Sequence, residues 1–224
     1  MTLRAVLFDA LGTLVALDPP APHLRVALQR NTGVDVGAAA AARGFGAEID
    51  FYVANHMRGG DLEGLEALRD DCAAVLHQAL AVGGLDRAAV RRSMLEAIRF
   101  TPFPDVVPAL RDLRERGLSR VVVSNWDISL REGLASAGLE RLLDGAVSSA
   151  EVGLAKPAAE PFRAGLALAG VGASEALYVG DSVDTDIEGA RAAGLRAVLV
   201  SRGGDAPPRV ESVVRSLEQL PSLF

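Results

Sequence analysis

The sequence predicts an α/β fold, with a Rossmann-like parallel sheet, helices on both faces, and a small all-helical domain added to it. Two observations support this prediction. Short runs rich in Val, Leu and Ala alternate with segments of helical spacing, which is typical of parallel strands buried on both faces. One long stretch near the N-terminus breaks this alternation, because it has helical spacing and no convincing β run. A chain of 224 residues is long enough for such a core with an insert.

Five runs are expected to form the strands of the sheet. Each is apolar on both faces, ends in polar residues and is followed by a helix-like segment. In chain order they are RAVLFD (4–9), RVVVSN (120–125), GAVSSA (145–150), ALYVGD (176–181) and RAVLVS (196–201).

The segments between these runs carry helix signals. DVVPALRDLRERG has its apolar residues on one helical face, with Asp105 as a candidate N-cap and Gly117 as a stop. The pattern recurs over 127–138, where Asp127 is the expected N-cap, and again over 185–194. These segments would cover the sheet.

The stretch over residues 18–99 is expected to form the helical insert. It is rich in Ala, Leu, Arg and Glu, and LEALRDDCAAVLHQAL and AAVRRSMLEAI have helical spacing. FTPFPD at 100–105, with two prolines, is expected to be the hinge that returns to the sheet. The predicted domains are therefore 1–17 with 100–224 as the core, and 18–99 as the insert.

Composition excludes several classes of partner. A net charge of -6 and a pI near 5.1 give no broad basic field, so we expect no nucleic acid partner. Asp9 interrupts the apolar stretch at the N-terminus, which argues against a signal peptide, and no other stretch is long enough to span a membrane. The single cysteine, Cys72, fits a reducing compartment. We expect a cytoplasmic monomer or homodimer that does not bind membranes.

The basic residues are used very unevenly. The chain has 22 arginines and one lysine, Lys156. A genome that favours arginine would explain the 22 without any functional meaning. It does not explain the exception, because a compact ammonium suits a tight site for one oxyanion better than a planar guanidinium does. Lys156 is therefore a candidate site residue.

Polar residues at the strand ends are expected to share one crevice, because ligands of open parallel sheets bind at the carboxyl ends of the strands. Lys156 lies in a loop, EVGLAKP, that precedes a helix and could reach the same place. The strand-end candidates are Asp9, Ser124, Asn125 and Asp181, with Asp186 about one helical turn further on.

This set of residues permits phosphoryl transfer. Carboxylates with oxygen-rich neighbours and no His or Cys nearby suit a hard cation such as Mg²⁺. One lysine and a Ser-Asn pair would clamp a phosphoryl group. An aspartate beside a metal ion can act as a nucleophile, giving an aspartyl-phosphate that water later opens.

Four motifs carry a family resemblance. LFDALGTL, VVSN, GLAKP and VGDSVDTDIEGARAAG occur in this order, each after a predicted strand or in a linking loop. They resemble the four signature motifs of the haloacid dehalogenase superfamily, and the last is the most specific. The insert at 18–99 resembles the cap that one subgroup places after the first motif, a subgroup acting on small soluble substrates.

The resemblance implies roles for individual residues. Asp9 would be the nucleophile and a Mg²⁺ ligand, and the backbone carbonyl of Leu11 would be another ligand. Asp181, with Asp186, would complete the metal site. Ser124 and Lys156 would hold the phosphoryl group, and Asn125 could donate to it through its amide. Each residue could instead have a purely structural role, such as capping a turn for the aspartates or making a local hydrogen bond for Ser124.

Leu11 departs from the pattern of most phosphatases in this superfamily. They have a second aspartate there, which protonates the leaving oxygen and then activates water. Leucine can do neither, and loss of a positioned acid or base is typically worth about 10²- to 10⁴-fold in rate. The residues expected around Asp9 nevertheless resemble those of the phosphatases in this superfamily.

Three hypotheses about the function are compatible with a leucine at position 11. The favoured one is a Mg²⁺-dependent phosphohydrolase acting on a small phosphorylated metabolite with altered proton transfer. A 2-haloacid dehalogenase also has a bulky residue there, but lacks the metal acid that Asp181 represents. The third is a relative that binds a phosphorylated ligand without turnover. Specificity would reside in the insert, and Tyr52 and Trp126 could line a substrate pocket, although large aromatics at domain contacts are more often packing residues.

Overall fold

The strand order of the main sheet places β1 at its centre. The computed structural model describes residues 2–203, 210 and 212–224. In this part of the chain six strands pair in parallel in the order β5-β4-β1-β6-β7-β8. They are β1 (Ala5–Phe8), β4 (Ser119–Ser124), β5 (Gly145–Ser148), β6 (Ala176–Gly180), β7 (Arg196–Val200) and β8 (Val213–Val214). The predicted parallel sheet is thus confirmed, and the short β8 is an addition to it.

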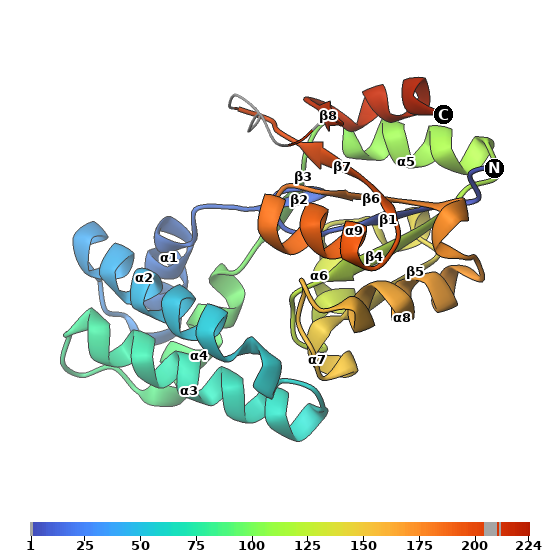
Figure 1. Ribbon diagram of the computed structural model, residues 1–224. Coiled ribbons are helices and arrows are strands. Elements are labelled where there is room, and N and C mark those ends of the chain that lie inside the picture. Colours follow the sequence, from blue (N-terminus) through green and yellow to red (C-terminus); the bar gives the residue numbers. More distant parts are fainter. Residues whose placement is uncertain (1, 204–209, 211) are drawn as a thin grey trace.

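Helices cover both faces of this sheet (Figure 1). Alternate residues of each strand point to opposite faces, so Phe8 packs with α5 on one side and Leu7 with α8 on the other. The helices of the core are α5 (Val106–Glu115), α6 (Leu130–Ser136), α7 (Ser149–Val152), α8 (Ala159–Ala169) and α9 (Gly189–Ala192), with the π-helical η4 (Val183–Glu188) and the short 3-10 helices η2 (Glu140–Leu142), η3 (Ala173–Glu175) and η5 (Leu217–Leu223).

Four helices form a separate layer to one side of the sheet (Figure 1). We call it the helical layer. It consists of α1 (Pro20–Thr32), α2 (Ala38–Asn55), α3 (Leu62–Leu80) and α4 (Arg87–Ala97), with the short η1 (His56–Arg58) after α2. The helices pack around their own apolar cluster, centred on side chains such as Leu28, Leu68 and Leu76. That residues 18–99 fold as a domain of their own stays a prediction.

A two-stranded ribbon joins the helical layer to the core. β2 (Val15–Leu17) pairs antiparallel with β3 (Phe100–Pro102), and the Asp18 N–H donates to the Arg99 carbonyl at 2.9 Å. The sequence predicts a hinge over 100–105, and the first three of these residues form β3. The strand escapes notice because three residues ending in proline give too short a pattern, and proline is tolerated here because the ribbon has free edges.

Of the two predicted helix caps, Asp105 is confirmed in position, without a capping hydrogen bond, and Asp127 is wrong. Asp105 stands at the N-cap position of α5, but its carboxylate binds Arg202 at 2.8 Å and the Leu217 N–H at 2.7 Å instead of the helix. Asp127 lies two residues before the N-cap of α6, Ser129, and accepts that residue's N–H at 2.7 Å. Both aspartates therefore stabilise tertiary or turn structure.

Over the described residues, every helix is too short or too polar to cross a bilayer.

Candidate active site

The site lies where the chain changes direction in the sheet. From β1 the chain adds β4 and β5 on one side, then returns to add β6 and β7 on the other. The carboxyl ends of β1, β4 and β6 therefore border one crevice. Asp9 follows β1, Ser124 ends β4, and Asp181 follows β6. The Asp9 N–H still donates to the Val179 carbonyl at 2.9 Å, which fixes its backbone to the sheet.

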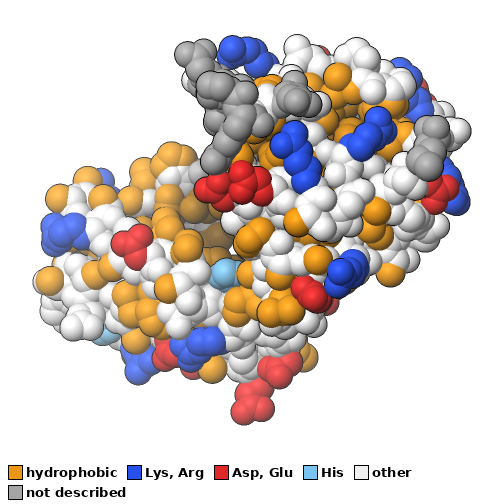
Figure 2. All heavy atoms as spheres, in the orientation of Figure 1, with side chains coloured by type: hydrophobic (Ala, Val, Ile, Leu, Met, Phe, Trp, Pro, Cys, Tyr) orange, Lys and Arg blue, Asp and Glu red, His pale blue; other side chains and the backbone are white. Residues whose placement is uncertain are grey.

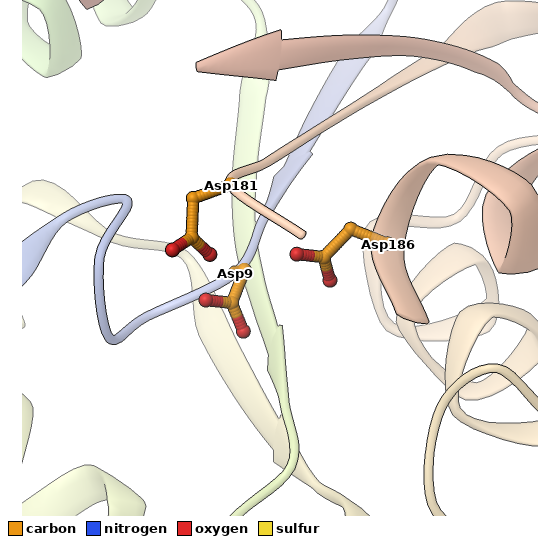
Figure 3. A group of neighbouring side chains, drawn as sticks. All are labelled: Asp9, Asp181 and Asp186. Carbon is orange, nitrogen blue, oxygen red and sulfur yellow. The ribbon is translucent and has the colours of Figure 1, made fainter. Parts of the chain in front are cut away.

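Three carboxylates come together in this crevice. Figure 3 shows Asp9 between Asp181 and Asp186. One oxygen from each lies within 4.8 Å of the others. Asp9 and Asp186 are buried and Asp181 is exposed. Asp186 is carried by η4, whose π-helical turn is a geometry frequently found at functional sites.

Lys156 holds two of these acids together. Its Nζ atom lies 2.7 Å from Asp9 Oδ1, 2.6 Å from Asp186 Oδ1 and 2.8 Å from the Tyr178 hydroxyl. The side chain is only 2 % exposed. Burial by itself would lower the pKa of Lys156, but the Asp9 and Asp186 carboxylates raise it above its ordinary value. The sole lysine of the chain is thus a buried, fully hydrogen-bonded ammonium.

The Asp9 carboxylate is oriented through one of its oxygens. The Ser124 hydroxyl donates to Oδ1 at 2.8 Å, and Lys156 donates to the same atom. Neither of these two hydrogen bonds involves the second carboxylate oxygen, Oδ2. Burial raises the pKa of Asp9, Lys156 lowers it, and the nearby Asp186 charge raises it further, with a net shift upward.

Tyr178 is a site residue that the sequence analysis missed. It lies in the middle of β6, fully buried. Its hydroxyl lies 3.0 Å from both the Val123 carbonyl and Asp186 Oδ1, and it accepts from Lys156. The available signal was a phenol inside an otherwise apolar buried strand, because a buried tyrosine hydroxyl usually has a polar partner.

Asn125 holds the loop that carries Lys156. Its side-chain amide donates to the Lys156 carbonyl at 3.0 Å and its oxygen accepts the Lys156 N–H at 2.7 Å. This pair of bonds fixes the backbone from which the ammonium extends. Its predicted contact with the phosphoryl group stays a prediction, although Asn125 also lines the adjoining pocket.

Two glycines leave room for the acids. A Cβ atom on Gly12 would lie 2.1 Å from Asp181 Oδ2, and one on Gly180 would lie 2.4 Å from Asp186 Cγ. Gly12 also has a φ of 85°, which side chains rarely adopt. A larger residue at either position would push an aspartate out of the crevice.

The donor set fits a divalent cation. Three carboxyl groups and one ammonium meet in the crevice, so its fully ionised form carries an excess of two negative charges. Partial desolvation, and then the charges of Asp9 and Asp186, raise the pKa of Asp181 to about 6. Hard oxygen ligands of this kind are those that Mg²⁺ prefers. The arrangement can therefore bind a small cation and an anion side by side.

Leu11 faces an apolar pocket between the helical layer and the core. The pocket has a volume of about 580 Å³, and Figure 2 shows the molecule hollowed there between hydrophobic side chains. Tyr52 and Trp126 both line it, and Trp126 also packs on Phe100, with ring centroids 4.9 Å apart. Leu11 and Asn125 lie on its wall, so the pocket adjoins the acidic crevice.

Comparison with known proteins identifies relatives of the whole chain. Residues 3–194 match the family described as haloacid dehalogenase-like hydrolase. The chain is 30% identical over 224 residues to the glyceraldehyde 3-phosphate phosphatase of Methanopyrus kandleri, which covers 96% of this chain and 92% of that protein.

Solved structures share the fold. The HAD phosphatase from Thermococcus onnurineus superposes with a TM-score of 0.68 at 23% identity, over 99% of this chain and 97% of that one. The 2-haloacid dehalogenase from Pseudomonas syringae pv. Tomato DC3000 gives 0.67 at 24% identity, over 99% and 98%. Because enzymes named for two different reactions fit equally well, the fold alone does not distinguish between these reactions.

Proposed function

Since the chain belongs to the haloacid dehalogenase-like hydrolases, we propose that it is a Mg²⁺-dependent phosphohydrolase acting on a small phosphorylated metabolite. One observation carries the proposal. The Asp9 carboxylate is held by Ser124 and a buried lysine, while two more carboxylates lie within 4.8 Å. The name of the Methanopyrus kandleri relative, a phosphatase, supports the same reaction.

Asp9 is the proposed nucleophile. Its Oδ2 attacks the phosphorus atom, the bond from phosphorus to the ester oxygen breaks, and that oxygen leaves with the electron pair. Water then attacks the phosphorus of the aspartyl-phosphate, which releases phosphate and restores the carboxylate. Ser124 and Lys156 hold the phosphoryl oxygens, and Lys156 screens Asp9 from their charge.

Asp9, Asp181 and Asp186, with the backbone carbonyl of Leu11, are the proposed ligands of Mg²⁺. When bound, the ion would neutralise the excess negative charge of the crevice and stabilise charge on the phosphoryl oxygens. Without it, an incoming phosphate dianion would meet three carboxylates and one ammonium.

Leu11 leaves the departing oxygen without a protein acid at the usual place. Catalysis then depends on how stable the departing oxyanion is by itself. We expect turnover to fall steeply from aryl esters to alkyl esters, because an alkoxide is a much stronger base than a phenolate.

Two measurements test the proposal. The first follows phosphate release from an aryl phosphate with and without Mg²⁺, in the unmodified protein, in Asp9→Asn and in a control, Asp50→Asn, on the exposed side of α2. We expect Mg²⁺-dependent release that Asp9→Asn abolishes and Asp50→Asn preserves. The proposal is wrong if phosphate release persists in Asp9→Asn.

The second measurement addresses the alternative favoured by the apolar side chain of Leu11. Incubation with 2-chloropropionate without metal tests for halide release, the reaction of a 2-haloacid dehalogenase. Halide release without phosphatase activity would establish that alternative. Binding of a phosphate analogue with neither reaction would identify a binding protein.

A further inference from the structure

The pocket beside the acidic crevice is large enough for most of a small organic molecule. Its volume of about 580 Å³ lies within the ordinary range for ligand sites. Most of its wall is apolar, with contributions from α2, α3, α4, the ribbon and the loop after β4. The apolar and aromatic lining residues include Leu11, Leu17, Phe45, Ile49, Leu68, Met94, Ile98, Phe100 and Trp126.

The charged groups of the pocket are mainly acidic. Glu48, Asp127 and Glu132 line it, and Arg69 is the one guanidinium or ammonium among its described lining residues. Arg69 already pairs with Glu66 at 3.1 Å and with Glu132 at 3.2 Å. Burial raises the pKa of Glu48 to about 7. A second anionic group on a ligand would therefore meet carboxylates and an occupied cation.

Two buried polar atoms of the pocket are poorly satisfied. Among the described residues, neither the Tyr52 hydroxyl nor the His56 Nε2 atom makes a hydrogen bond of good geometry, although Asp127 lies beside the Tyr52 hydroxyl and adds to burial in raising the pKa of Tyr52. The other ring nitrogen of His56, Nδ1, lies 3.0 Å from the Val53 carbonyl. Unsatisfied buried polar atoms cost about 1–3 kcal/mol each. A ligand hydroxyl group could accept from the Tyr52 hydroxyl and donate to His56 Nε2, which is the acceptor nitrogen when Nδ1 donates to the Val53 carbonyl.

The pocket is placed to receive the part of a substrate that leaves. Leu11 is two residues beyond Asp9, and Asn125 follows Ser124, which hydrogen-bonds Asp9. A phosphoryl group at Asp9 would thus have its ester oxygen directed along Leu11 into the pocket. Leu11 thus lacks the acid that is usual at its position and contributes apolar surface to the pocket wall instead.

We propose that the pocket binds the leaving group of the substrate and selects phosphate monoesters of uncharged, mainly apolar alcohols that carry a second hydroxyl group for Tyr52 and His56. The assignment rests on the proposed phosphohydrolase function. It excludes metabolites with a second phosphate or a carboxylate, because the pocket offers them no free cation.

Binding can be measured without catalysis, because Trp126 is the single tryptophan of the chain and lines the pocket. The full-length protein without added metal is titrated with 2-cyclohexylethanol and, separately, with cyclohexylacetate at about pH 8, above the pKa of Glu48. These compounds differ mainly in charge, and neither absorbs where tryptophan is excited. We expect a saturable fluorescence change with the alcohol and roughly tenfold or weaker affinity for the carboxylate.

Three variants separate the contributions. Glu48→Gln removes a charge and should raise the affinity for cyclohexylacetate severalfold, whereas Glu115→Gln, on the exposed side of α5, should not. Tyr52→Phe keeps the ring and removes the poorly satisfied hydroxyl, so it should weaken binding of the alcohol by roughly threefold to tenfold. Equal binding of alcohol and carboxylate, or no binding of either, would overturn the assignment.

The same comparison, of an uncharged hydroxyl with a carboxylate, distinguishes this proposal from the phosphatase proposal. With Mg²⁺, 2-(4-hydroxycyclohexyl)ethyl phosphate, which keeps a ring hydroxyl for Tyr52 and His56, should have a higher kcat/KM than an analogue with a carboxylate in place of that hydroxyl. If the alcohol binds as expected and no ester is hydrolysed, the pocket assignment holds and the phosphatase proposal fails. If esters are hydrolysed with preference for the carboxylate, the phosphatase proposal holds and the pocket assignment fails.

Discussion

At the carboxyl edge of the sheet, Lys156 contacts three oxygen atoms, whereas in the adjoining pocket the Tyr52 hydroxyl and His56 Nε2 make no hydrogen bond of good geometry with any described residue. The first region is charged and internally hydrogen-bonded. The second is mainly apolar, and these two polar atoms are available to a ligand. Under the proposed function, bond cleavage and substrate selection would therefore take place in separate regions, and Leu11 lies at the boundary between them.

The largest loss of stability and activity should come from removing the ammonium of Lys156 from the charged region. Lys156→Met leaves buried carboxylates unpaired, which typically costs about 3–5 kcal/mol. Urea denaturation at about pH 8 should show that loss, together with loss of phosphatase activity. The deficit should shrink at lower pH, because the stranded carboxylates can then take up protons.

A surface change provides the control for this effect. Arg163→Met removes a base that is 68% exposed and pairs with Glu160 at 3.5 Å. Exposed pairs contribute about 0–1 kcal/mol. If Lys156→Met costs no more than Arg163→Met, the ion cluster does not hold the site together, and the contrast between the two regions fails.

Leu11→Asp tests the border between the regions. An acid at this position should raise phosphate release from alkyl esters by roughly 10- to 10²-fold, with a smaller gain for aryl esters, because aryl oxyanions need less protonation. Leu11→Asn, which is polar but supplies no proton, is the matched control. An equal gain in both variants would show that wall shape, not proton transfer, limits turnover.

The charge of the crevice predicts a pH-dependent effect of Mg²⁺ on stability. The folded-state pKa of Asp181, about 6, lies above its ordinary value of 3.8. Its protonated form is therefore favoured by folding, and this contribution is full below the ordinary pKa and is lost as pH rises through about 6. Mg²⁺ should consequently raise Tm more at about pH 8 than at about pH 5.

Asp181→Asn should reduce both the fall of Tm with pH and the response to Mg²⁺, while Asp50→Asn should leave both unchanged. Thermal unfolding by circular dichroism, with magnesium chloride against the same ionic strength of sodium chloride, gives the comparison. An equal or larger Mg²⁺ effect at low pH would contradict the assignment of this cluster.

The smallest effect should come from the pocket wall. Val53→Ala trims a lining residue that is 64% exposed, so stability should change by no more than about 0.5 kcal/mol. The affinity for 2-cyclohexylethanol should nevertheless fall severalfold. Val26→Ala, 66% exposed on α1 and outside the pocket lining, should change neither. Equal behaviour of the two variants would mean that the wall makes no contact with the ligand.

The sequence predicted the charged region far better than the apolar one. Asp9, Ser124 and Asp181 were found because they end buried strands, and parallel strands bring their carboxyl ends to one edge. Lys156 was found because it is the only lysine. Tyr178 was missed because it sits within a strand, where a position shows burial but not which polar group it meets.

The pocket could not be read from the sequence in the same way. Glu48 and Met94 lie on different helices, and helical spacing shows which residues share a face but not which helix or loop that face meets. Similarly, Arg202 binds Asp105, 97 residues away, and the Thr13 carbonyl, 189 residues away. Contacts at such separations depend on tertiary packing, which local pattern does not encode.

Trapping of the covalent intermediate tests the account most directly. The protein is mixed with Mg²⁺ and an aryl phosphate, quenched, and treated with borohydride, which reduces an acyl phosphate to the alcohol of homoserine. Peptide mass spectrometry should then find homoserine at position 9, and none in Asp9→Asn. Phosphate release without any modification of Asp9, or with modification of another carboxylate, would contradict the account.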